Sequence, residues 1–265
     1  SNGTLSGQFY MGDTPKAANA LEYDPDSSVS FVPSKVELST EGADDVTITA
    51  DDLKNYEVTY YKADKKGNPT GDAIAAPKDA GKYVVVVEQL KGDYKGGKAK
   101  LAFEISAQQI SKATAVTLDE DGDVAAKAES LTYTGVEQEI GYALTTKAGD
   151  KTLVEGTDYT VKYYKGGSDL TDANLISGAP VDQGAYVAVL TGMGNYAGST
   201  DKKGITVNAF DLANITAVGD ITTTSAAQPA HPTSITVGTG ADAKEITEPA
   251  LLNQIDLKLA GSDKY

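Results

Sequence analysis

Few residues in this sequence could do acid–base or metal chemistry. His231 is the only histidine, and it lies between Ala230 and Pro232 in a stretch rich in Ser, Ala, Gln and Pro. Cysteine is absent, which excludes disulfides and zinc sites of the usual His and Cys kind. A Ser–His–Asp triad would need His231, but no GxSxG turn or comparable nucleophile turn accompanies it. We predict an exposed turn at His231, and we expect the protein not to be an enzyme.

An acidic run has spacing that could suit a metal ion. Asp119, Asp121 and Asp123 occupy alternate positions, from which carboxylates can converge on calcium. An EF-hand loop beginning at Asp119 would need Gly at its sixth position and Glu at its twelfth, where Val124 and Ser130 stand. The EF-hand is therefore excluded. A looser calcium loop stays open as a hypothesis, and a solvated acidic loop is favoured over it.

Tyrosines are the best candidates for a contact surface. Acidic pairs for glycoside hydrolysis are not excluded by number, because the chain has 38 acidic residues, but it has no tryptophan to form the usual sugar platform. Four tyrosines stand out, two by strand parity and two in hairpin loops: Tyr61, Tyr164, Tyr94 and Tyr196. The favoured alternative is that these rings pack on neighbouring loops or on the outer face of their own sheet. No cofactor is expected.

Charge excludes several classes of partner. The formal net charge is −15 and arginine is absent, so the clustered cations and the bidentate fork that nucleic-acid binding uses are missing. An acidic chain is also repelled by anionic lipid. No apolar stretch approaches the roughly 18 residues that span a bilayer, so we expect no direct membrane insertion of this segment.

Most of the chain is one pattern used twice. Asp79, Gly81 and Tyr83 return as Asp182, Gly184 and Tyr186, and NYEVTYYK at 55–62 returns as DYTVKYYK at 158–165. KGDYKG at 91–96 corresponds to GMGNYAG at 192–198, where Tyr94 pairs with Tyr196. KATAV at 112–116 is echoed by NITAV at 214–218. Such a register predicts two modules, 1–107 and 108–209, and a partial or divergent third, 210–265. We interpret the chain as a fragment of a longer repetitive protein.

The repeated segments predict an all-β fold. Val, Ile, Thr and Tyr alternate with polar residues in short runs separated by Gly, Asp and Asn. In immunoglobulin-like sandwiches, a tyrosine at the start of a late strand bonds a backbone group upstream through its hydroxyl. Tyr83 and Tyr186 suit that role. We therefore predict tandem immunoglobulin-like β-sandwich modules in an elongated arrangement.

A family resemblance follows from the longer motifs. LTYTG at 131–135, KTLVEGTDYTVKYYKGG at 151–167 and DQGAYVAVLTGMGNYAG at 182–198 resemble the mostly bacterial Ig-like (MBG-type) repeats of bacterial cell-surface proteins. The first module departs from them, with YDPD in place of YTGV and TADDLK in place of KTLVEG. The resemblance implies spacer or adhesive units of wall-attached or secreted proteins, and no catalytic residues.

These observations lead to two functional hypotheses. The first is a non-enzymatic stalk or spacer, a monomeric rod at the bacterial cell surface or secreted. The alternative is a ligand-binding module that recognises a host protein or a surface glycan through exposed loop tyrosines. Lys–Asn isopeptide bonds, which occur in some Gram-positive surface modules, also stay open, because 23 lysines do not select a pair.

Overall fold

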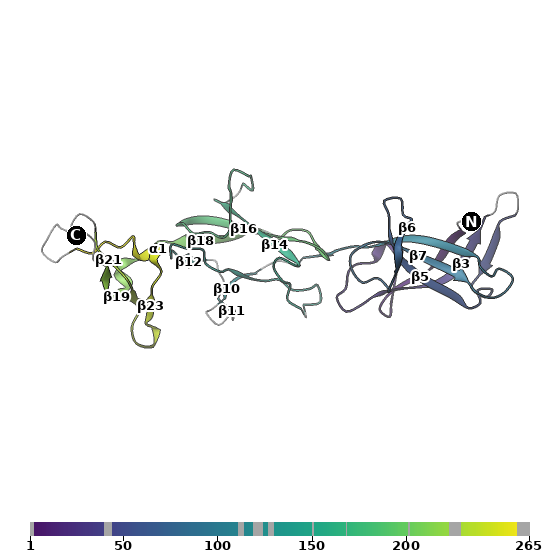
Figure 1. Cartoon of the computed structure of the whole chain (residues 1–265), viewed down its shortest axis with the longest axis horizontal. Coiled ribbons are helices and arrows are strands. Elements are labelled where there is room, and N and C mark those ends of the chain that lie inside the picture. Colours follow the sequence, from purple (N-terminus) through teal and green to yellow (C-terminus); the bar gives the residue numbers. More distant parts are fainter. Residues whose placement is uncertain are drawn as a thin grey trace.

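The computed structural model is mostly β, with 50% strand and one short helix, α1 (Pro249–Leu252). It describes residues 3–39, 44–110, 114–118, 124–126, 130–149, 151–167, 169–200, 202–222 and 229–258. The described core residues form three separate clusters, and the parts of the chain that contain them follow one another along the long axis in Figure 1. We call these parts the first, second and third units, by the ranges 1–107, 108–209 and 210–265. The high strand content predicted from the sequence is confirmed.

The first unit is built on one eight-stranded sheet. Its order is β4-β3-β1-β8-β7-β5-β6, with β2 paired to β1. The strands are β1 (Gly3–Met11), β2 (Thr14–Lys16), β3 (Val29–Leu38), β4 (Val46–Thr49), β5 (Tyr56–Ala63), β6 (Pro69–Ile74), β7 (Gly81–Gln89) and β8 (Lys98–Ile105). The ring of Phe9 on β1 lies 4.8 Å from that of Phe31 on β3 and 4.9 Å from that of Phe103 on β8. One core therefore joins both halves of the sheet.

The second unit repeats the central strands of the first. Its five-stranded sheet has the order β12-β18-β16-β14-β15, and a smaller sheet has the order β11-β10-β13. The bounds are β10 (Thr114–Leu118), β11 (Val124–Ala126), β12 (Ser130–Thr132), β13 (Gly141–Ala143), β14 (Tyr159–Lys165), β15 (Leu175–Ile176), β16 (Gly184–Gly192) and β18 (Lys203–Asn208). Tyr163 faces Ala188 across β14 and β16 as Tyr60 faces Val85 across β5 and β7. The repeated sequence thus keeps its strand register.

The third unit is smaller than the other two. It contains a three-stranded sheet of β19 (Ile215–Val218), β22 (Ile235–Val237) and β23 (Lys244–Ile246), and a pair formed by β20 (Ile221–Thr222) and β21 (His231–Pro232). Ile235, Leu252 and Ile255 form its core. The unit boundaries and the immunoglobulin-like arrangement stay predictions.

The repeated pattern of Asp79, Gly81 and Tyr83, written DxGxY below, forms in both copies the hydrogen bond predicted for its tyrosine. The hydroxyl of Tyr83 donates to the carbonyl oxygen of Asp79 at 2.7 Å, and the hydroxyl of Tyr186 donates to that of Asp182 at 2.8 Å. A Cβ added to Gly81 would lie 3.4 Å from the Tyr83 hydroxyl oxygen, so the tyrosine folds back over the glycine. The predicted bond to an upstream backbone group is confirmed in both copies.

Several tyrosine side chains are buried in the core of the second unit. Inside it, the hydroxyl of Tyr142 donates to the hydroxyl of Tyr163 at 2.8 Å. Burial raises the pKa of both groups above the ordinary value of 10.0. Burial, with the nearby charge of Glu155 as the next cause, raises the pKa of Tyr159 to about 12. These phenols therefore hold their protons more tightly in the folded state than in the unfolded chain.

We expect the free energy of unfolding of the second unit to fall above about pH 10. A phenol whose pKa is raised by folding contributes stability that is complete below the unfolded pKa and is lost as the pH passes through the folded pKa. Tyr142→Phe should weaken this dependence on pH. Urea unfolding at several alkaline pH values, with tyrosinate absorbance recorded in parallel, measures both effects. Ionisation of all tyrosines near pH 10 in a chain that stays folded would contradict the prediction.

Candidate functional site

The first and second units are joined by a strand rather than by a free loop. β9 (Gln108–Gln109) follows directly on the first unit and pairs in parallel with β17 (Tyr196–Ala197) of the second. The amide of Gln108 donates to the carbonyl of Asn195 at 2.9 Å, and the amide of Ile110 donates to that of Ala197 at 3.0 Å. The connection therefore has little slack.

The side chain of Gln108 ties the two units together. It is buried, its Nε2 donates to the carbonyl of Tyr23 at 3.2 Å, and its Oε1 accepts from the amide of Lys147 at 2.8 Å. Tyr23 belongs to the first unit and Lys147 to the second. A side-chain amide carries both a donor and an acceptor, so one residue satisfies a backbone group on each side.

Asn195 makes a second two-point contact across the junction. Its Oδ1 accepts from the amide of Ala80 at 2.8 Å, and its Nδ2 donates to Oδ1 of Asp79 at 3.0 Å. Asp79 is the aspartate of the first DxGxY pattern. Its carbonyl holds Tyr83 within the first unit while its carboxylate holds the second unit. A hydrogen bond to a carboxylate is stronger than one between neutral groups.

Two aromatic rings close the interface between these amides. The rings of Tyr23 and Tyr196 meet edge to face, with centroids 5.6 Å apart and planes at 81°. Tyr23 packs against the cores of both units. Burial, with the charge of Asp79 as the next cause, raises the pKa of the Tyr23 phenol. The aromatic contact lies beside the hydrogen bonds of Gln108 and Asn195, most of which are partly buried.

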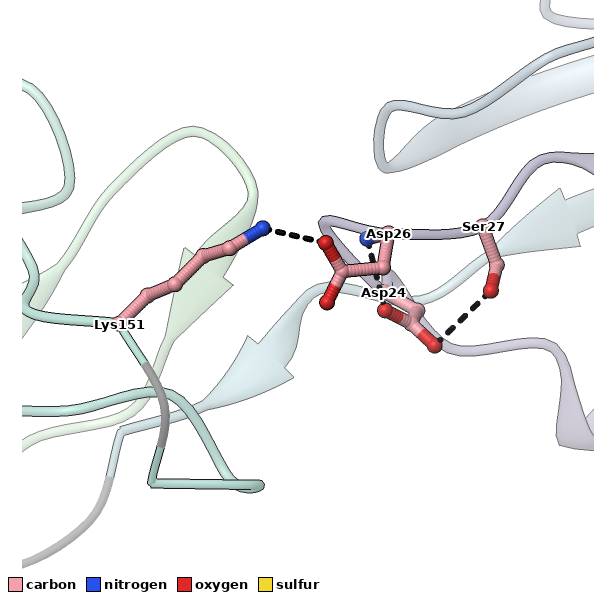
Figure 2. Close-up of polar contacts among 4 residues, drawn as sticks. All are labelled: Asp24, Asp26, Ser27 and Lys151. Carbon is pink, nitrogen blue, oxygen red and sulfur yellow. Dashed lines mark hydrogen bonds and ion pairs between the residues drawn. The ribbon is translucent and has the colours of Figure 1, made fainter.

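Ion pairs surround this buried centre. Lys147 pairs with Glu22, with Nζ and Oε1 3.5 Å apart, and Lys151 pairs with Asp26. Figure 2 shows how the turn is formed: Asp24 accepts from the amide of Asp26 and from the hydroxyl of Ser27, which leaves the Asp26 carboxylate pointing at Lys151. Both pairs are largely exposed to solvent, so each contributes at most about 1 kcal/mol.

The junction between the second and third units uses the corresponding end of the second unit. Tyr133 lies on the segment that pairs with the closing strand β18, as Tyr23 does with the residue after β8. Nε2 of Gln254 donates to the hydroxyl of Tyr133 at 2.6 Å. Gly135 has a positive φ of 83°, and a Cβ there would lie 2.8 Å from the backbone of Ala250. A glycine is therefore required where the second unit meets α1.

The four tyrosines proposed as a contact surface do not share one environment. Tyr94 is 41% exposed, but Tyr196 is only 5% exposed because it packs in the core of the second unit and against Tyr23. The prediction of an exposed ring at Tyr196 is wrong. Tyr61 and Tyr164 are half-buried, and their cross-strand partners, Val84 and Val187, are buried. These two rings lie on the outer face of their own sheet, as the alternative interpretation predicted.

The structure describes His231 but not the acidic run. Asp119, Asp121 and Asp123 lie outside the described residues. His231 lies in the short strand β21, half-buried, with its Nδ1 2.9 Å from the carbonyl oxygen of Ile255 and 3.6 Å from Oδ1 of Asp256, so the predicted exposed turn is wrong. The described residues contain no group of three or more His, Cys, Asp or Glu side chains that could hold a metal ion. They also contain no helix long and apolar enough to span a membrane.

One lysine contacts an asparagine closely. Nζ of Lys100 donates to Oδ1 of Asn68 at 2.6 Å. The nearby Asp64 accepts from the amides of Lys66 and Asn68, and the bond from Asn68 is the main reason that its pKa is lowered. Isopeptide formation needs a proton donor beside the amide that is attacked, and an ionised carboxylate does not supply one. The contact is therefore best described as a hydrogen bond.

A separate hollow of about 590 Å³ lies in the second unit. Glu137, Glu139 and Glu155 line it together with Tyr163 and apolar residues of β14 and β15. Burial raises the pKa of Glu155, and the charge of Glu139 adds to the effect. The hollow has no counterpart among the residues that the sequence singled out.

Sequence reasoning missed the two amides that form the junction. Gln108 gave no signal beyond its place in a short link, because a glutamine has no characteristic pattern. Asn195 could have been suspected, since Asp93 stands at its repeat-equivalent position while most neighbouring positions agree. Comparison with protein-family models and with curated proteins found no match.

We expect Gln108→Ala to loosen the first junction. The substitution leaves the carbonyl of Tyr23 and the amide of Lys147 without a partner, which costs about 1–3 kcal/mol for each group that stays dry. Amide hydrogen exchange should accelerate at 195–197 while the core strands β7 and β16 keep their protection.

Gln109→Ala is the matched control, because Gln109 is exposed and lies on the same strand. Equal exchange rates in the two variants would show that the Gln108 side chain does not couple the units.

Proposed function

We propose that this chain is a non-enzymatic spacer: a stiff segment of tandem immunoglobulin-like β-sandwich modules from a bacterial cell-surface or secreted protein. The observation that carries the proposal is the buried junction centred on Gln108, which binds backbone groups of both units at once. Units joined only by a flexible linker would not be expected to share a buried contact of this kind.

The proposed module type is supported by two features. Both complete copies place a tyrosine hydroxyl on the carbonyl of the aspartate four residues earlier, as immunoglobulin-like corners do. Both also use the same strand register around that tyrosine. The extracellular assignment rests on the resemblance of 131–135, 151–167 and 182–198 to repeats of bacterial surface proteins, and on an acidic, cysteine-free composition that suits a long exposed molecule.

Stiffness follows from what bending would break. Opening the joint would separate Tyr23 from Tyr196 and would break the hydrogen bonds of Gln108 and Asn195 together. Each hydrogen bond contributes about 0.5–1.5 kcal/mol net, and the aromatic pair adds a comparable amount. Because the contacts share one small interface, they form and break together. Bending is therefore opposed by several kcal/mol at once.

The ligand-binding alternative has less support than the four tyrosines gave it. It depends on Tyr94, the most exposed of the four tyrosines at 41%, because Tyr61 and Tyr164 are half-buried on the sheet faces. The hollow lined by Glu137, Glu139 and Glu155 is the specific observation that favours it. Its carboxylates would suit a sugar or a cationic side chain.

Small-angle scattering tests the spacer proposal. A globular chain of 265 residues would have a radius of gyration of about 18 Å, and we expect a clearly larger value. The value should change little between about 0.1 M and 1 M salt, because the exposed ion pairs are screened while the buried amides are not. A radius near that of a globule, or a chain that collapses or spreads as salt is added, would refute a stiff rod.

A further inference from the structure

The end of each complete unit that carries the hairpin loop of Tyr94 or Tyr196 is covered in the second unit and exposed in the first. In the second unit, Tyr196 is 5% exposed: it belongs to the core of that unit and also contacts Tyr23 of the first unit edge to face. Tyr94 occupies the repeat-equivalent position in the first unit and is 41% exposed. Tyr159 is 3% exposed within the core of its own unit, whereas its equivalent Tyr56 is 40% exposed. The first unit therefore exposes rings whose counterparts are buried.

The loop that carries Tyr94 is already ordered by its own unit. The amide of Gly96 donates to the carbonyl of Gln89 at 2.7 Å, and that of Gly97 donates to the carbonyl of Tyr94 at 3.0 Å. The buried side chain of Gln89 holds the neighbouring segment through the amide of Lys54 and the carbonyl of Asp52. Leu90 bonds Asn55 as Met193 bonds Asp158 in the second unit. The platform is formed before any partner arrives.

We propose that this end of the first unit, formed by Tyr56, Leu90, Asp93 and Tyr94, docks a further unit of the same repeat. The incoming unit would present the end that Tyr23 and Asp79 form on the first unit, with its aromatic ring against Tyr94. The proposal extends the interface already formed by Tyr23 and Tyr196. It rests on that geometry and goes beyond the spacer role.

Asp93 determines which unit fits. Asn195, its equivalent, accepts from a backbone amide and donates to the Asp79 carboxylate. A carboxylate at this position still accepts from the backbone amide, but it has no hydrogen to donate. An aspartate at the Asp79 position of the partner would face a like charge. The partner must therefore carry a donor there. An asparagine would restore the side-chain hydrogen bond with donor and acceptor exchanged, while the bond from the backbone amide keeps its direction.

A second copy of the chain does not fit this requirement. Its Tyr23 end is covered by its own second unit, and its Tyr133 end contacts Gln254 of its own third unit. Both ends also carry an aspartate in the DxGxY position, Asp79 and Asp182. The occupant is thus a unit outside the described residues of this chain, and it differs from the first two at that position.

The experiment extends the full chain with one additional unit. A second copy of residues 3–110 is placed ahead of the native N-terminal segment, once with Asp79 unchanged and once with Asp79→Asn in the added copy. The substitution keeps the Tyr83 hydrogen bond, because Tyr83 bonds the backbone oxygen of residue 79. In both extended chains the added copy also carries Tyr94→Phe, so that nitration by tetranitromethane, quantified at each tyrosine by mass spectrometry, reports only how exposed Tyr94 of the native first unit is.

We expect nitration of Tyr94 to slow by about tenfold in the chain with Asp79→Asn, as for a docked state that outweighs the open state ten to one. The chain with Asp79 unchanged should protect Tyr94 much less, and Asp93→Asn should restore its protection. Tyr61 should react equally in all chains, and Tyr196 should stay protected in all of them.

Two results would overturn the proposal: a Tyr94 that reacts in the Asp79→Asn chain as fast as in the unextended protein, or equal protection whether residue 79 of the added copy is Asp or Asn. Neither result would bear on the spacer proposal, which is tested by scattering from the unextended chain.

Discussion

A buried side-chain amide with one hydrogen bond on each side is the contact on which the joined structure depends. Backbone groups at the end of a β-module have no ladder partner, and burying them against another module is unfavourable unless each finds one. Gln108 supplies a donor to Tyr23 and an acceptor to Lys147 from the link itself. The link is therefore part of the interface between the two units that it joins. Because it is short and is held on both sides, it opposes bending of the joint.

Asp79 extends this logic into the fold of the first unit. Its carbonyl accepts from Tyr83 and its carboxylate accepts from Asn195. The first bond fixes the corner that begins β7, and the second places the following unit against that corner. A displacement at the joint is thus transmitted to a residue at the edge of the core, and a well-packed corner holds the joint in turn. Asp182 keeps the first role in the second unit, where Gln254 and Gly135 make the onward contact by other means.

The sequence predicted what depends on a single unit and missed what depends on two. The alternation in β5, β7 and their repeats determined strand register, and DxGxY predicted the hydroxyl bonds of Tyr83 and Tyr186. Strand parity placed Tyr61 and Tyr164 correctly on outer faces. Tyr196 was misjudged because a hairpin loop is exposed only if no neighbour covers it, and the covering ring is more than 170 positions away along the chain. His231 was misjudged because the Asp256 and Ile255 contacts that hold it come from beyond α1.

Differences between copies then acquire a physical meaning. Residues that hold a single unit together, such as the DxGxY tyrosines, are the same in both copies because each unit has to pack the same core. Residues at the ends of a unit contact the neighbouring unit, and that neighbour differs from joint to joint. Repeat-equivalent positions there can therefore differ, as Asn195 and Asp93 do, and as Lys151, which forms an ion pair, and Thr49 do. If every end were identical, any unit could follow any other. Where two carboxylates meet at a joint with no donor between them, like charges face each other, and this repulsion can favour one order of units over another.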